Sequence, residues 1–181
     1  MLDEMLRQLR YDEADGGQPN LTVYDDATGR AIVPGTYVQG HPTIGIGLAL
    51  DTRGITSAQA ETLFEAAVAS TEAAMPDAVP EWTRLDAVRR DALTNMGFEM
   101  GAHGVGEFLT MRGHLREAIA SVAAGDTAGA WDAFHAAAVA ALDSAWAREL
   151  ARFGSLRARR VAAQLATGDA QAAPLPIGLV A

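Results

Sequence analysis

The chain has 181 residues, of which 49% are hydrophobic, and a formal net charge of −9 because 23 acidic residues outnumber 14 basic ones. This length and hydrophobic share suit one folded domain, while the acidic balance argues against a general nucleic-acid binder. The sequence contains no cysteine, which excludes disulfides, thiolate metal sites and a cysteine nucleophile.

The N-terminal residues predict an amphipathic helix. Leu2, Met5, Leu6 and Leu9 follow the i, i+3, i+4, i+7 spacing of one helical face. Glu13 falls where this helix should end, because the glycines and proline of the following A-D-G-G-Q-P stop it. The C-terminal end of a helix carries partial negative charge, which disfavours an ionised carboxylate and favours its protonated form. We therefore expect Glu13 to serve as a general acid.

A small antiparallel sheet is predicted next, between Leu21 and Ile46. The β-prone runs L-T-V-Y, A-I-V and T-Y-V are separated there by glycine and proline. Asp26 of Y-D-D follows the first run, and T-I-G-I-G begins at Thr43. An ionised Asp26 that faces Glu13 would divide acid from base roles. Sixteen residues separate Asp26 from Thr43, and the simplest expectation for them is an extended hairpin.

The remaining chain has helical patterns almost throughout. Thr56 and Gln59 have the spacing of a capping box, and the helix that follows is expected to run from Ser57 to Met75. Pro76 should end it. The terminal A-P-L-P-I-G-L-V-A is expected to be poorly ordered.

Several motifs occur in one order along the chain. R-Y-D-E, Y-D-D-x-x-G, T-I-G-I-G and G-I-T-S-A-Q-A-E-T-L-F are followed by L-D-A-V-R-R-D-A-L-T-N-M-G-F-E-M-G, G-V-G-E-F, S-A-W and R-A-R-R-V. Together they resemble the phage-type lysozymes, the endolysin muramidases of glycoside hydrolase family 24, over nearly the whole chain.

The resemblance implies an α+β, lysozyme-like fold in which a small antiparallel sheet lobe is joined by a long helix to a larger helical lobe. One lysozyme-like domain would span 1–181, with a sheet lobe at about 14–55, a linking helix at about 56–76, a helical lobe at about 81–168 and a tail at 169–181.

The implied activity is hydrolysis of the β-1,4 bond between N-acetylmuramic acid and N-acetylglucosamine in peptidoglycan, for cell-wall degradation and lysis. Glu13 would protonate the glycosidic oxygen, Asp26 would activate water, and Thr43 would help to hold that water. This suits an inverting mechanism, whose carboxyl groups stand roughly 6.5 to 9.5 Å apart. No metal or organic cofactor is expected, and the four histidines have no metal-site spacing.

The resemblance also assigns residues in the helical part. Phe98 and Glu99 of N-M-G-F-E-M match substrate-binding positions that line the cleft. Arg157, which begins R-A-R-R-V, matches a supporting arginine that reaches toward the catalytic glutamate.

Some alternatives stay open at this point. The intervals between Glu13, Asp26 and Thr43 are longer than is usual in the family, so Asp15 or Asp25 are alternatives for the second acid. The other functions considered are a catalytically silent, lysozyme-like protein that binds peptidoglycan or builds a virion, and an unrelated helical interaction domain. The five arginines between 148 and 160 form a local basic stretch that suits an anionic polymer.

The expected partner is the peptidoglycan glycan strand, with no nucleic acid and no membrane span, and a monomeric state is expected. The N-terminus lacks the basic segment, apolar run and cleavage site of a secretory signal. A phage- or prophage-encoded protein made in the bacterial host cytoplasm, acting at the periplasmic cell wall after release, is therefore expected. Free endolysin and virion-associated lysozyme are both consistent with the sequence.

Overall fold

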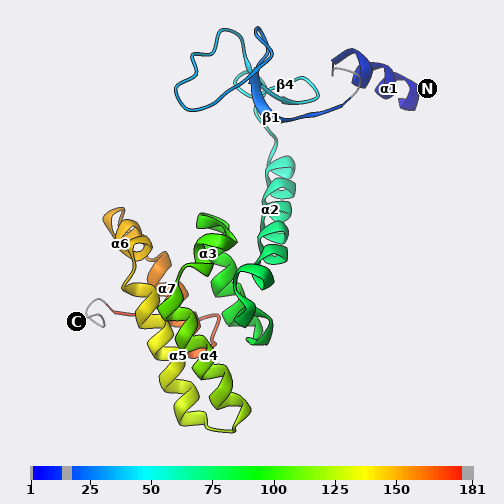
Figure 1. Ribbon diagram of the computed structural model, residues 1–181. Helices are drawn as coiled ribbons and strands as arrows, with labels where there is room; N and C mark the ends of the chain where they lie inside the picture. The colour runs from blue at the N-terminus through cyan, green and yellow to red at the C-terminus, as the bar shows by residue number, and fades with distance from the viewer. Residues whose placement is uncertain (1, 14–17, 177–181) are drawn as a thin grey trace. The chain divides into compact units, whose positions relative to one another are not determined.

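The computed structural model describes residues 2–13 and 18–176 (Figure 1). The chain divides into two compact units, Met1–Thr62 and Leu63–Ala181, which we call the sheet unit and the helical unit. Within the described ranges, no helix is both long and apolar enough to cross a bilayer.

The sheet unit begins with helix α1 (Leu2–Glu13), which confirms the predicted helix and its end at Glu13. Asp3 and Glu4 lie in its first turn and Arg10 in its last, as the helix dipole favours. Asp15, one alternative for the second acid, lies outside the described residues.

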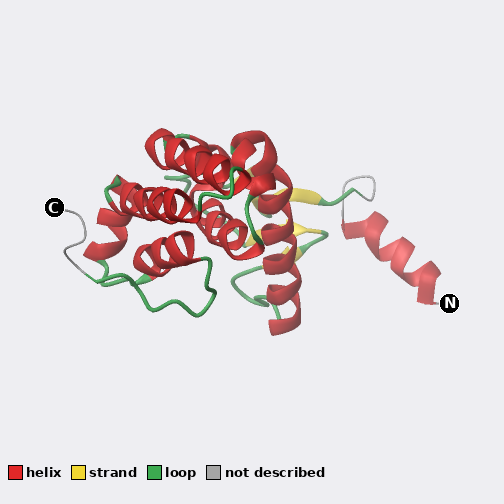
Figure 2. Ribbon diagram, turned by 90° about the horizontal axis from the view of Figure 1, so that it is seen from below, coloured by secondary structure: helices red, strands yellow, loops and turns green. Residues whose placement is uncertain are grey.

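A four-stranded antiparallel sheet follows α1, and its strands are coloured yellow in Figure 2. The spatial order is β2-β1-β3-β4, so β1 and β3 occupy the centre. The sheet predicted between 21 and 46 is therefore confirmed, with one further short strand beyond it. The strands are β1 (Asn20–Asp25), β2 (Arg30–Ala31), β3 (Pro42–Gly45) and β4 (Leu48–Ala49).

The prediction of an extended hairpin after Asp26 was wrong. The paired residues of β1 and β2 are Tyr24 with Ala31 and Asp25 with Arg30, and one more backbone bond joins the N–H of Ile32 to the oxygen of Val23 (2.9 Å). The T-Y-V run at 36–38 is not a strand. The physical reason is that the next backbone N–H groups, at 39–41, donate to the side chains of Asp25 and Asp26 instead of to a neighbouring strand.

The buried side chains of the sheet unit are polar. Among its described residues only Asp25 and Thr43 are buried, at 2% and 3% exposure, and no hydrophobic side chain of this unit is. Hydrogen bonds at these two residues therefore form the interior of the unit.

Helix α2 (Ser57–Ala78) begins with the predicted capping box. The N–H of Gln59 donates to Thr56 Oγ1 (3.2 Å), and the N–H of Thr56 donates to Gln59 Oε1 (2.9 Å). The helix ends three residues later than the predicted end at Met75. Pro76 lies inside the helix, in its last turn, where its missing N–H removes one helical hydrogen bond without ending the helix. A 2.7 Å bond from the N–H of Val79 to the oxygen of Met75 closes the end.

The helical unit continues with a series of helices packed against one another. α4 and α5 run side by side, and α7 packs against both α5 and α3 (Figure 1). α3 is kinked at Gly101, whose φ of 79° is non-helical. The elements are the 3-10 helix η2 (Pro80–Arg84), α3 (Ala87–Gly106), α4 (Leu109–Ala123), α5 (Thr127–Leu142), α6 (Ala145–Arg152) and α7 (Arg157–Thr167).

The apolar core of the helical unit joins α2, α3, α4, α5 and α7. Part of the tail expected to be poorly ordered packs against this core through Leu175. The backbone of Leu175 is held by Arg159: the N–H of Leu175 donates to the oxygen of Arg159, and the oxygen of Leu175 accepts from Arg159 Nε. Large side chains in the core that are almost completely buried are Met75, Leu93, Met96, Met111, Leu115 and Leu165.

Candidate active site

Glu13 is the last residue of α1, and its side chain lies against the backbone of Gly47. A Cβ on Gly47 would stand 2.7 Å from Glu13 Oε2. Gly47 lies between β3 and β4 with a φ of 67°, a conformation that favours glycine. The structure therefore brings the expected general acid to the second glycine of the T-I-G-I-G motif.

Asp26 directly follows β1 and is exposed. Two contacts join it to His41: its N–H donates to the oxygen of His41 (3.2 Å), and its Oδ1 accepts from the N–H of His41 (2.6 Å). One carboxylate oxygen is therefore held by the backbone while the side chain stays open to solvent.

Thr43 lies in β3, where it is paired with Tyr24 of β1. Its side chain is buried, and Oγ1 donates to the oxygen of His41 at 3.1 Å. The hydroxyl hydrogen is therefore engaged, which leaves the oxygen lone pairs to accept from a water. Asp26 and Thr43 thus share one partner, His41.

Asp25 is buried, and its carboxylate accepts three backbone N–H groups. Gln39 donates to Oδ2 (2.9 Å), Gly40 to Oδ1 (2.9 Å) and Ala27 to Oδ1 (3.1 Å). The bond from Gln39 does most to lower the pKa of Asp25; burial raises it, but the bonds from Gly40 and Ala27 keep it below its ordinary value. A carboxylate whose oxygens already accept three backbone N–H groups is poorly suited to accept a proton from water, the role for which Asp25 was an alternative.

Phe98, in α3, is 41% exposed and lines a pocket of about 440 Å³ in the helical unit. Its ring meets that of Phe64 edge to face, with centroids 5.5 Å apart. Asn95 and Arg157 line the same pocket, so the structure brings two of the expected site residues together.

Glu99 is held by two partners. Its Oε2 accepts from Trp146 Nε1 at 3.0 Å and lies 3.3 Å from Arg157 Nη1. Arg157 is fixed in turn by Asn95, with Nε 2.6 Å from Asn95 Oδ1 and Nη2 2.9 Å from the Asn95 oxygen. A reach of Arg157 toward Glu13 would join residues of different units and stays a prediction.

Three arginines of the basic stretch are engaged by neighbouring groups, two of them by carboxylates. Arg148 pairs with Asp143 (3.2 Å), Arg157 pairs with Glu99, and Arg159 donates to the oxygen of Leu175. Arg157 also lines, with Arg160, a largely polar pocket of about 530 Å³ between α7 and the segment 170–174.

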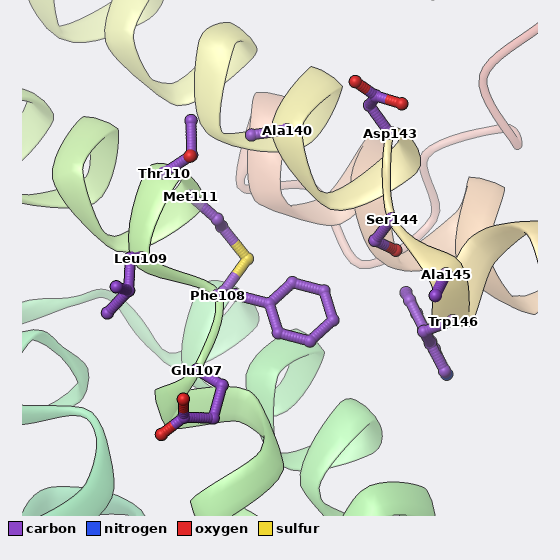
Figure 3. A pocket seen from close by; sticks show the side chains of 10 residues that line it. All are labelled: Glu107, Phe108, Leu109, Thr110, Met111, Ala140, Asp143, Ser144, Ala145 and Trp146. Carbon is purple, nitrogen blue, oxygen red and sulfur yellow. The ribbon is translucent and has the colours of Figure 1, made fainter.

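A further pocket, of about 390 Å³, lies between the start of α4 and the junction of α5 with α6 (Figure 3). Phe108 and Trp146 supply its aromatic wall, with ring centroids 6.4 Å apart. Glu107, Asp143 and Ser144 add polar groups to the lining.

Sequence reasoning missed three residues that hold the site residues in place. These are His41, which contacts both Asp26 and Thr43, Asn95, which fixes Arg157, and Trp146, which donates to Glu99. Asn95 and Trp146 lie in the N-M-G-F-E-M and S-A-W motifs, but the sequence does not signal their contacts, because their partners are 62 and 47 positions away. His41 acts through its backbone, which no side-chain pattern reveals.

Comparison with known families identifies the class of protein to which these residues belong. The sequence model of the family described as phage lysozyme matches residues 19–162, well over half of the chain. The matched stretch includes Asp26, Thr43, Phe98, Glu99 and Arg157, and it begins after Glu13. No curated protein matches the chain.

Proposed function

Because the chain belongs to the phage lysozyme family, and is therefore a peptidoglycan-hydrolysing muramidase, we propose that Glu13 and Asp26 are its catalytic acid and base. The observation that carries the assignment of Asp26 is the contact that it and Thr43 both make with His41. In support, the backbone of His41 hydrogen-bonds both to the exposed carboxylate of Asp26 and to the hydroxyl of Thr43, whose oxygen can still accept a hydrogen bond.

In the proposed reaction Glu13 donates its proton to the glycosidic oxygen as the bond to the anomeric carbon breaks. Asp26 accepts a proton from water, whose oxygen attacks the anomeric carbon from the opposite face. Thr43 Oγ1 accepts a hydrogen bond from that water. The products are two shorter glycan strands, and the new reducing end has inverted configuration.

Phe98 and Glu99 are proposed to contact the sugar rings, with Arg157 in support. The exposed ring of Phe98 offers an apolar face, and the Glu99 carboxylate is oriented by Arg157 and Trp146. Phe98→Ala should raise KM more than it lowers kcat. Phe153→Ala is the matched control, because Phe153 is an exposed aromatic residue of the same unit that is absent from the proposed site.

The decisive assay measures reducing-end release from purified peptidoglycan by the unmodified protein, Glu13→Gln and Asp26→Asn. Each variant should lose about 10²- to 10⁴-fold in rate, as expected when a general acid or base is removed. Asp12→Asn is the control, because Asp12 is the adjacent exposed carboxylate of the same helix. Circular dichroism must show equal folding.

The outcomes separate the roles. Loss in Glu13→Gln alone would redirect the base role to another carboxylate, and Asp15→Asn would then be assayed. No release by the folded, unmodified protein across pH would contradict catalysis, and binding of wall fragments would then identify a silent protein. Proton NMR of the first product should show the α-anomer, whereas the β-anomer would contradict inversion.

We also propose that the enzyme is a monomer that reaches the periplasmic wall after synthesis in the host cytoplasm. The family supports the wall as its site of action. Mass spectrometry of purified particles distinguishes a virion-associated lysozyme from a free endolysin, and light scattering after gel filtration measures the oligomeric state.

A further inference from the structure

Three consecutive N–H groups in the stretch between Asp26 and Thr43 donate to two neighbouring carboxylates, each N–H to one of them. The N–H groups of Gln39 and Gly40 donate to Asp25, and the N–H group of His41 donates to Asp26. We call Gln39–His41 the 39–41 segment. Through it, the stretch that separates Asp26 from Thr43 returns to the end of β1.

Gly40 shows how closely this segment approaches Asp26. A Cβ on Gly40 would overlap Asp26 Oδ1 and would stand 2.8 Å from both the nitrogen and the Cβ of Ala27. The position of the Asp26 carboxylate therefore depends on glycine at 40 for space as well as on His41 for a hydrogen bond.

Asp25 is the group that can hold the segment there. It is one of the two buried side chains among the described residues of the sheet unit, and it accepts backbone donors from both sides of the contact, at 27 and at 39–40. Hydrogen bonds from N–H groups to an ionised carboxylate are stronger than those between neutral groups. Long connections are otherwise among the more mobile parts of a protein.

We propose that Asp25 is a positioning residue for the hydrolysis, which fixes the 39–41 segment so that His41 orients both Asp26 and the hydroxyl of Thr43. This inference rests on the proposed role of Asp26 as base. It assigns a function to the unusually long interval between Asp26 and Thr43, whose last residues hold the catalytic group in place.

The backbone of His41 connects the 39–41 segment directly to both Asp26 and Thr43. The oxygen of His41 accepts both the N–H of Asp26 and the hydroxyl of Thr43, and β3 begins at the next residue, Pro42. Releasing the 39–41 segment would therefore disturb the base and the water-holding hydroxyl at the same time. A displacement of about 1 Å at a catalytic group can cost about a hundredfold in rate.

The test uses the full-length protein with Asp25→Asn, which keeps the size of the side chain and removes its charge. We expect kcat to fall about tenfold to a hundredfold while KM stays within about twofold, since the sugar-binding residues are untouched. Amide hydrogen exchange should become faster at Gln39, Gly40 and His41. Val33→Ala is the control, because Val33 is exposed and lies in the same long connection.

A purely stabilising role predicts a different result. It would lower Tm yet leave kcat per folded molecule unchanged well below Tm. Unchanged kcat in Asp25→Asn, together with faster exchange at Gln39 and Gly40, would overturn the inference.

A second variant keeps the proposal testable if Asp25→Asn fails to fold. Gly40→Ala leaves Asp25 intact and forces the Asp26 carboxylate to move, so kcat should fall while KM is kept. Gly113→Ala is the matched control, because its nearest heavy atom is 3.9 Å from the added Cβ. If Gly40→Ala and Gly113→Ala have the same kcat, the inference is overturned.

Parallel assay of Asp26→Asn separates this proposal from the one on which it rests. An inactive Asp26→Asn beside an active Asp25→Asn means that only the positioning role fails. An active Asp26→Asn means that the assignment of the base fails. An inactive Asp25→Asn beside an active Asp26→Asn would overturn both.

Discussion

The carboxylate of Glu13 occupies the space that a side chain on Gly47 would need. Glu13 Oε2 stands 2.7 Å from the position of a Cβ on Gly47, a distance shorter than such contacts allow. The glycine of T-I-G-I-G nearest to the proposed acid therefore has a steric role in addition to its backbone conformation.

We expect Gly47→Ala to reduce kcat more than Gly45→Ala does. Both glycines have a positive φ, 67° and 69°, so each alanine should cost about 1–2 kcal/mol in the free energy of unfolding. Only Gly47→Ala displaces Glu13, since nothing lies within 4 Å of a Cβ on Gly45. Urea unfolding and initial rates of peptidoglycan hydrolysis measure the two effects, and equal kcat values would contradict the steric role.

Glu81 should stabilise the helical unit strongly. It is buried between Arg112 (3.0 Å) and Arg116 (2.7 Å). Glu81→Gln should lower the free energy of unfolding by about 3 kcal/mol, because it leaves a buried pair broken. Glu117→Gln, which removes an exposed partner of His114, should cost at most about 1 kcal/mol.

The effect of Glu81 should depend on pH. Burial raises its pKa, but the hydrogen bonds from Arg112 and Arg116 hold the pKa below the ordinary 4.5. A lowered folded-state pKa gives stability that is present above 4.5 and lost as pH falls through the folded-state pKa. The difference in unfolding free energy between the parent and Glu81→Gln should therefore shrink below pH 4.5, and a constant difference down to pH 2 would contradict the ion pair.

The ring of His41 should titrate above its ordinary range. Its Nδ1 lies 2.9 Å from Asp51 Oδ2, and the hydrogen bond and charge of Asp51 raise the pKa of His41 above 6.5, while His41 lowers the pKa of Asp51. The stability from His41 is complete below pH 6.5 and is lost as pH rises through its folded-state pKa, and that from Asp51 is lost in acid.

NMR titration of the His41 ring protons checks this. Asp51→Asn should move the midpoint down toward 6.5, and the signals of the other three histidines serve as internal controls. A midpoint that does not move in Asp51→Asn would rule out the pairing.

Glu99 should matter for stability mainly as an acceptor for the 9%-exposed Trp146. Glu99→Ala leaves the indole N–H without this acceptor and should cost about 1–3 kcal/mol in the free energy of unfolding. Glu99→Gln keeps an acceptor and should cost less than about 1 kcal/mol. Urea unfolding followed by tryptophan fluorescence measures both, and equal losses would show that the charge, not the hydrogen bond, is what matters.

The parts of the candidate site that were predictable are those defined by short motifs. Glu13 was proposed from helical spacing and the glycines that follow it, and Asp26, Thr43 and Arg157 were proposed from the order of motifs along the chain. Their supporting residues were not found. His41 acts through its backbone, whose hydrogen bonds do not depend on which side chain it carries.

The sequence by itself determined the family, through the order of motifs along the chain. It also determined the end of α1 at Glu13 and the capping box of α2, because these two features depend on residues a few positions apart. Tertiary structure alone decided that Asp25 is buried and bound to Gln39 and Gly40, 14 and 15 positions away, and that no extended hairpin forms beyond Arg30 and Ala31. The physical reason is competition for backbone donors. A buried carboxylate can accept N–H groups that a strand would otherwise pair, and only the folded chain brings that carboxylate to them.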